Sequence, residues 1–172
     1  LIALLLPAPL LAAAGQWRGV CGMKSTLWHL AGIVSAFTLG HSVTLIGAAL
    51  FDWRLPAPPV EVMIALSILI SAIHALRPLF PGREAWVAAL FGLVHGLAFA
   101  TVVSRFGLDA GERTLSILGF NIGIEIVQLM VVFAVIPSLL LLAGTGQYRI
   151  LRVGGGVGAV IASLGWIAER LS

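Results

Sequence analysis

Long apolar segments separated by short charged loops dominate the pattern along this chain. A helical segment of about 20 apolar residues, rising about 1.5 Å per residue, crosses the roughly 30 Å hydrocarbon layer of a bilayer. A backbone surrounded by lipid must satisfy its own hydrogen bonds, which an α-helix does and an open strand does not. The sequence therefore predicts five membrane-spanning helices, at Trp28–Phe51, Pro59–Leu76, Ala85–Ser104, Thr114–Ala143 and Ile150–Leu171.

The chain opens with another apolar run, Leu1–Ala14, which has two interpretations. It resembles the apolar core of a signal peptide, because Ala12–Ala14 offers the small residues of a cleavage site. It also fits the second half of a spanning helix whose beginning is missing, which is the interpretation we favour. The expected fold is then all-α, a polytopic transmembrane helix bundle of about five complete helices plus a truncated first helix, in a single transmembrane domain over residues 1–172.

Composition supports a membrane location, because 60% of the residues are hydrophobic and only 10% are charged. A soluble domain carries about 25% charged residues, so this chain cannot cover a water-facing surface. A soluble enzyme and a nucleic-acid binder are therefore excluded, although the sequence pI is near 10.0. The ten Lys and Arg stand singly in the loops and helix flanks, where they indicate topology.

We call side A the end of the bundle that holds the loops 15–27, 77–84 and 144–149, and side B the opposite end. Side A carries six basic residues, which are Arg18, Lys24, Arg77, Arg83, Arg149 and Arg152. Side B carries four, which are Arg54, Arg105, Arg113 and Arg170. The excess of positive charge makes side A the expected cytoplasmic side.

Three polar residues lie near the middle of predicted spans: His41, His95 and Glu125. A charged acid at the bilayer centre costs at least ~2.5 kcal/mol, so such residues face the bundle interior and mark functional sites. Asn121 and Gln128 share a helix face with Glu125. We expect His41, His95 and Glu125 to project into one interior region. Each also has a structural interpretation, as a hydrogen-bonded packing residue or as a His–Glu pair that holds helices together.

The chemistry of these side chains suits a divalent metal ion. Imidazole and carboxylate groups suit Ni²⁺, Co²⁺ and Zn²⁺ better than Mg²⁺ or Ca²⁺. Cys21 is the single cysteine, so the sequence offers neither a thiol cluster for Cu(I) nor a disulfide framework. The sequence has no phosphate-binding loop of the Walker type, so transport would be passive, ion-coupled or driven by another subunit. His29 lies at the entrance of a helix, and His74, near a helix end beside Arg77, is expected at the interface.

Small residues four apart predict close approach between helices. Three such pairs occur, Gly92 with Gly96, Gly119 with Gly123, and Gly154 with Gly158.

Four motifs in order resemble the HupE/UreJ family of bacterial membrane proteins. They are FTLGHSVTL at 37–45, FGLVHGLAFA at 91–100, FNIGIEIVQ at 120–128 and WIAERL at 166–171. The resemblance implies a multi-pass protein of the bacterial inner membrane, associated with hydrogenase and urease gene clusters and acting as a nickel or cobalt permease. Family members typically carry an Asp-His motif just before an apolar run like Leu1–Pro9, which is why we favour a truncated first helix.

Three functions remain open from the sequence. The first is a permease for Ni²⁺ or Co²⁺, which would not be an enzyme and would bind the metal through His41, His95, Glu125, Asn121 and Gln128. The second is a metal-dependent intramembrane hydrolase, in which a bound metal activates a water. The third is a membrane-embedded assembly partner of a nickel metalloenzyme. The expected partners are the lipid bilayer, a divalent metal ion, and either further copies of the chain or metalloenzyme assembly proteins, with no nucleic acid and no firm cofactor.

Overall fold

A computed structural model of the protein describes residues 1–13, 15–51, 53, 56–103, 110–143 and 145–171. Its elements, in chain order, are α1 (Ile2–Leu5), β1 (Leu10–Ala13), β2 (Gln16–Val20), α2 (Met23–Leu50), α3 (Ala57–Leu76), α4 (Glu84–Val103), α5 (Ala110–Leu142) and α6 (Gly146–Leu171). Of the basic residues counted for side B, Arg54 and Arg105 lie outside the described residues, as do the predicted end residues Ala14 and Ser104.

The all-α membrane bundle expected from the sequence is confirmed. Each of the five predicted long helices is present, and the largest shift is at α2, which begins at Met23 instead of Trp28. Four of them are long and apolar enough to cross a membrane: Met23–Ala48, Ala57–Leu76, Leu115–Leu142 and Gly146–Leu171. In α4 the apolar stretch Glu84–Phe99 is shorter. The chain is therefore a multi-pass membrane protein.

The opening segment differs from the expected helix. Helix α1 ends at Leu5, and the chain continues into an antiparallel hairpin in which Leu10 pairs with Val20 and Ala13 with Gln16. Pro7 and Pro9 explain the change, because proline lacks a backbone N–H and breaks a continuing helix. The apolar run is thus only partly helical, and the hairpin folds against side A of the bundle.

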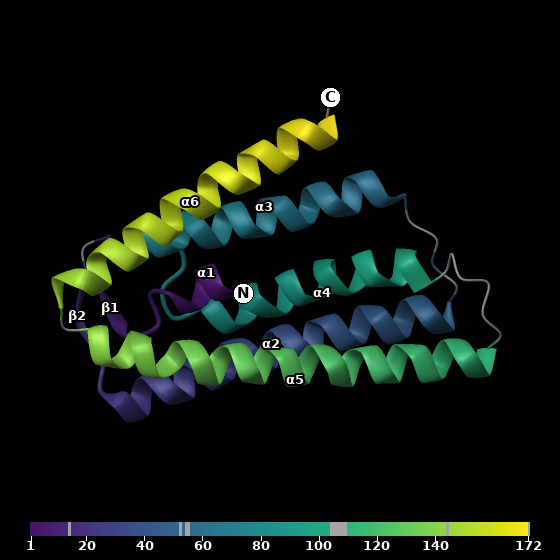
Figure 1. Ribbon diagram of the computed structural model, residues 1–172, viewed down its shortest axis with the longest axis horizontal. Helices are drawn as coiled ribbons and strands as arrows, with labels where there is room; N and C mark the ends of the chain where they lie inside the picture. Colours follow the sequence, from purple (N-terminus) through teal and green to yellow (C-terminus); the bar gives the residue numbers. More distant parts are fainter. Residues whose placement is uncertain (14, 52, 54–55, 104–109, 144, 172) are drawn as a thin grey trace.

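The long helices form two closely packed pairs (Figure 1). Helices α2 and α4 run side by side in the same direction, and α3 lies along α6. Helix α5 lies along the outside of α2, and most of its apolar side chains are exposed. The largest core cluster joins Leu4 and Leu5 of α1 to Leu30, Ile33 and Phe37 of α2 and Ala88 of α4. The N-terminal residues therefore fill the space between the two pairs.

The predicted glycine packing is confirmed for one of the three pairs. A Cβ on Gly92 would clash with the carbonyl oxygen of Phe37, and one on Gly96 would lie 2.5 Å from the carbonyl oxygen of His41. Gly92 and Gly96 therefore allow the backbones of α2 and α4 to touch. For the other two pairs the prediction is wrong within the described part of the chain, where an added Cβ meets no atom within 4 Å at Gly119, Gly123, Gly154 or Gly158.

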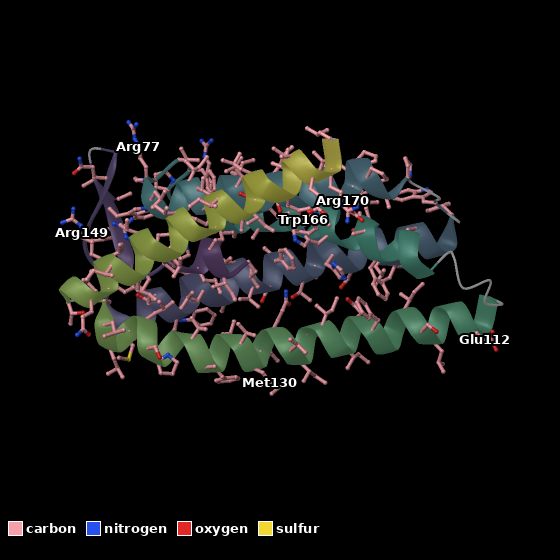
Figure 2. All side chains as sticks on the ribbon, turned by 45° about the horizontal axis from the view of Figure 1, so that its top comes forward. Arg77, Glu112, Met130, Arg149, Trp166 and Arg170 are labelled. Atoms are coloured by element: carbon pink, nitrogen blue, oxygen red, sulfur yellow. The ribbon has the colours of Figure 1, made fainter. Side chains whose placement is uncertain are left out.

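The loops assigned to side A do share one end of the molecule. Arg77 and Arg149 lie together beside the hairpin, and Glu112 of α5 lies at the opposite end (Figure 2). Side A therefore combines the hairpin, the end of α3 and the beginnings of α2, α4 and α6.

Candidate functional site

The two mid-helix histidines are brought together by the glycine contact between α2 and α4. The ring of Phe37 stacks on His41, with centroids 6.4 Å apart and an interplanar angle of 11°. The same ring meets the edge of His95 at 5.2 Å and 64°. The structure therefore places His41 and His95 in contact with one phenyl ring, that of Phe37.

His41 is buried without a hydrogen-bond partner. Its side chain is 4% exposed, and neither Nδ1 nor Nε2 meets a donor or acceptor among the described residues. An unsatisfied buried polar group costs about 1–3 kcal/mol, so such groups are rare and call for an explanation. A ring held in this state is suited to bind a metal ion, a proton or a water that enters from the adjoining cavity.

His95 has one ring nitrogen fixed by its own helix. Its Nδ1 lies 2.8 Å from the carbonyl oxygen of Phe91, and a carbonyl oxygen only accepts. Nδ1 therefore carries the proton, and Nε2 of the neutral ring keeps its lone pair. Metal-binding histidines are oriented in this way, with one ring N–H donated to a carbonyl and the other nitrogen on the metal.

The polar stripe of α5 faces α2 at two of its three positions. The side-chain amide of Asn121 donates to the hydroxyl of Ser42 at 2.8 Å. One turn closer to side A, the hydroxyl of Thr38 donates to Oε1 of Gln128 at 2.8 Å. These two bonds dock α5 on α2 and set Asn121 and Gln128 near the two histidines.

Glu125 is placed differently from the other four candidate residues. Its side chain is exposed on α5, although Asn121 and Gln128 lie one turn away on either side. Within the described ranges, no three His, Cys, Asp or Glu residues are arranged to hold one metal ion. The single chain therefore brings together His41, His95, Asn121 and Gln128 in one region but leaves Glu125 outside it.

Two cavities meet at the histidine pair. One, of about 400 Å³, is lined by both His41 and His95 together with Phe37 and Ile124. The other, of about 630 Å³, is mostly apolar and also reaches His95, Gln128 and the α3 hydroxyl of Ser71. His95 thus lies on the walls of both cavities, while His41 lines only the smaller one.

A second polar cluster, not predicted from the sequence, lies at side A. Oε2 of Glu84 is 3.5 Å from Nε2 of His29, and Oε1 of the same carboxylate is 3.5 Å from Nε2 of His74. Glu84 is 4% exposed and His74 is fully buried. The carboxylate therefore joins α2, α3 and α4 at the end where all three meet.

The tautomer of His74 is opposite to that of His95. Its Nδ1 accepts the backbone N–H of Leu79 at 3.1 Å, so the ring proton lies on Nε2 and points toward Glu84. His74 therefore turns its ring N–H toward the Glu84 carboxylate, 3.5 Å away, and has no lone pair to offer a metal from Nε2. The cluster could have been predicted from the topology of the helices, because the start of α2, the end of α3 and the start of α4 all lie at side A.

The sequence profile of the family described as HupE / UreJ protein matches residues 1–170. No curated protein and no solved structure matches the chain.

Proposed function

The chain belongs to the HupE/UreJ family, and from this premise we propose that it is a membrane permease for a divalent metal ion, nickel or cobalt, which passes the His41–His95 pair. One observation carries the proposal. His41 is a buried imidazole whose two nitrogens lack hydrogen-bond partners in the described chain. It shares a cavity wall with His95, whose lone pair is on Nε2. Two neutral imidazoles near the middle of a bilayer suit a borderline metal ion.

In this proposal the surrounding polar groups share the work of binding the ion. The imidazole nitrogens of His41 and His95 replace part of its water shell. The amide oxygens of Asn121 and Gln128 are additional, weaker ligands from α5. Glu125 supplies the negative charge that offsets a dication. Glu125 lies on the exposed face of α5. Its carboxylate would therefore lie at the edge of the metal site and not at its centre.

The experiment is uptake of radioactive nickel and cobalt by cells that produce equal amounts of the full-length protein. We expect His41→Leu and His95→Leu each to abolish uptake, because leucine fills a similar volume without a lone pair. His29→Leu is the matched control, since His29 lies on the same helix as His41 but outside the pair. Uptake by the His41 and His95 variants equal to that of the wild type would overturn the proposal.

The same cells separate the permease from an assembly role. A permease predicts that lost metal uptake precedes any loss of nickel-enzyme activity, and that added external nickel restores that activity. An assembly partner predicts unchanged uptake together with enzyme activity that added nickel does not restore.

A further inference from the structure

A third cavity, of about 810 Å³, opens at side A, and neither His41 nor His95 belongs to its lining. It lies between the hairpin, the end of α3 and the beginning of α6. Its polar lining includes Trp17, Arg77, Thr145, Tyr148, Arg149 and Arg152. Figure 2 shows Arg77 and Arg149 at this end of the molecule. Three arginines, Arg77 at the C-cap of α3 and Arg149 and Arg152 of α6, therefore line one cavity.

Arg152 is the fixed member of this group. Its guanidinium donates to the carbonyl oxygens of Ala75 and Leu76, the last two residues of α3, and its side chain is only 9% exposed. A cation at this position stabilises the end of a helix, where the backbone carbonyls are unpaired. Its Nε is nevertheless buried without a hydrogen-bond partner among the described residues. The cap of α3 therefore uses Nη1 of Arg152 and leaves the N–H of Nε available to another acceptor.

The positive charge around this cavity is not balanced by acids. No Asp or Glu belongs to its lining. The ion pairs found in the described part of the chain lie elsewhere, at Glu84 and between Arg170 and Glu61. A buried cation without a counter-charge is costly, so the buried guanidinium of Arg152 favours an anion that enters this cavity. Helix capping alone accounts for Arg152 but gives no reason for Arg77 and Arg149 to line the same space.

The shape and chemistry of the lining select the anion. Arginine presents a planar fork of donors that matches the oxygens of a phosphate group. The apolar residues Leu10, Val20 and Leu76 line the same cavity, and Ile150 on α6 is 73% exposed beside it. A basic pocket at the end of spanning helices, with apolar surface next to it, fits a lipid headgroup whose chains continue along the helices.

We propose that the cavity bounded by Arg77, Arg149 and Arg152 binds the phosphate group of an anionic membrane lipid. The site is separate from the histidine pair, so this inference does not depend on metal transport. Bound lipid would hold the hairpin, α3 and α6 together at side A. It would also strengthen the orientation that the positive charge of this side predicts, because anionic lipids attract basic groups at the membrane surface.

The test measures thermal unfolding of the purified full-length protein in a neutral detergent. Phosphatidylglycerol, phosphatidylcholine and inorganic phosphate are added separately over a range of concentrations. A ligand that binds only the folded state raises the stability by RT ln(1 + L/Kd), where L is the free ligand concentration, so Tm keeps rising with the logarithm of ligand concentration above Kd. We expect phosphatidylglycerol to raise Tm in this way, while phosphatidylcholine and inorganic phosphate do not at equal concentration.

Arg77→Gln and Arg149→Gln are the informative variants, because both side chains are exposed. Arg77 is the C-cap residue of α3 through its backbone N–H, which glutamine keeps. Each should weaken phosphatidylglycerol binding about tenfold, the loss expected for one charge-assisted hydrogen bond. Arg83→Gln is the matched control, since it removes the same charge from an exposed arginine at side A outside the cavity, and it should bind as the wild type does.

Three results would overturn the proposal. An equal response to phosphatidylcholine would show that the headgroup charge does not matter. A response to inorganic phosphate without one to phosphatidylglycerol would identify a site for a small anion instead of a lipid. Unchanged lipid affinity in both Arg77→Gln and Arg149→Gln would remove the arginines from the site.

Discussion

His95 donates its Nδ1–H to the carbonyl oxygen of Phe91, four residues earlier on α4, at 2.8 Å. This hydrogen bond determines which nitrogen of the ring is left with a lone pair. Nε2 is that nitrogen, and His95 lies in the walls of both cavities that meet at the pair. The same residue type at position 74 has the opposite tautomer, with its Nε2 3.5 Å from the carboxylate of Glu84.

Cobalt binding tests the role assigned to His95. We expect His95→Leu to lower the Co²⁺ affinity of the purified full-length protein by more than the roughly 10–100-fold that loss of an outer-shell partner costs. The visible absorption of Co²⁺ reports the ligand change directly. His29→Leu serves as the control and should bind Co²⁺ as the wild type does. Equal spectra and affinities for the wild type and His95→Leu would remove this nitrogen from the metal site.

Glu125→Gln tests whether the exposed carboxylate of α5 belongs to the transport path. The amide has nearly the same shape, so membrane insertion should be unchanged and the bonds of Asn121 and Gln128 to α2 should persist. We expect nickel and cobalt uptake to be abolished, because the negative charge that offsets the dication is gone. Glu61→Gln is the control, since Glu61 pairs with Arg170 at 2.5 Å and lies on another helix. Undiminished uptake in Glu125→Gln would leave the site to the histidines and amides alone.

Gly92→Ala tests the contact that holds α2 against α4. The added methyl group would clash with the carbonyl oxygen of Phe37, and a backbone atom cannot move aside as a side chain can. We expect the helices to separate, at a cost of about 1–3 kcal/mol of stability, as is typical of overpacking. Thermal unfolding in detergent measures the effect. Gly158→Ala, where the added Cβ meets no described atom within 4 Å, should leave Tm nearly unchanged, and a similar loss in both variants would argue against the contact.

Glu84→Gln tests the second polar cluster. The substitution removes the charge that His29 and His74 both face, and we expect a loss of about 1–3 kcal/mol, the cost of leaving a buried donor poorly paired. The measurement is again Tm of the full-length protein in detergent. His29→Gln should lose less, because the His29 side chain is 35% exposed and solvent screens its interaction with Glu84. A Tm for Glu84→Gln equal to that of the wild type would show that the cluster does not clamp the three helices.

The sequence by itself determined the membrane location, the five long helices and the depth of the polar residues. These properties depend on local composition, because any apolar segment of sufficient length partitions into lipid as a helix whatever its neighbours are. The pairing of His41 with His95 was also predictable, since two polar residues at one depth share the same reason to avoid lipid. The tautomer of His95 depends on a hydrogen bond within its own helix, to the carbonyl oxygen of Phe91, but only the structure shows that this bond forms.

The tertiary structure alone decided how each helix is rotated about its axis and which helices are neighbours. Rotation of α5 leaves Glu125 exposed while Asn121 and Gln128 reach α2, and a pattern that is apolar all round does not specify that angle. The arrangement of neighbouring helices places Gly92 against the backbone of α2, whereas a Cβ added at Gly119 meets no described atom within 4 Å. It also brought Glu84 between His29 and His74, and Arg152 to the end of α3. These contacts join residues far apart in the chain, so they depend on packing among whole helices and not on any local sequence signal.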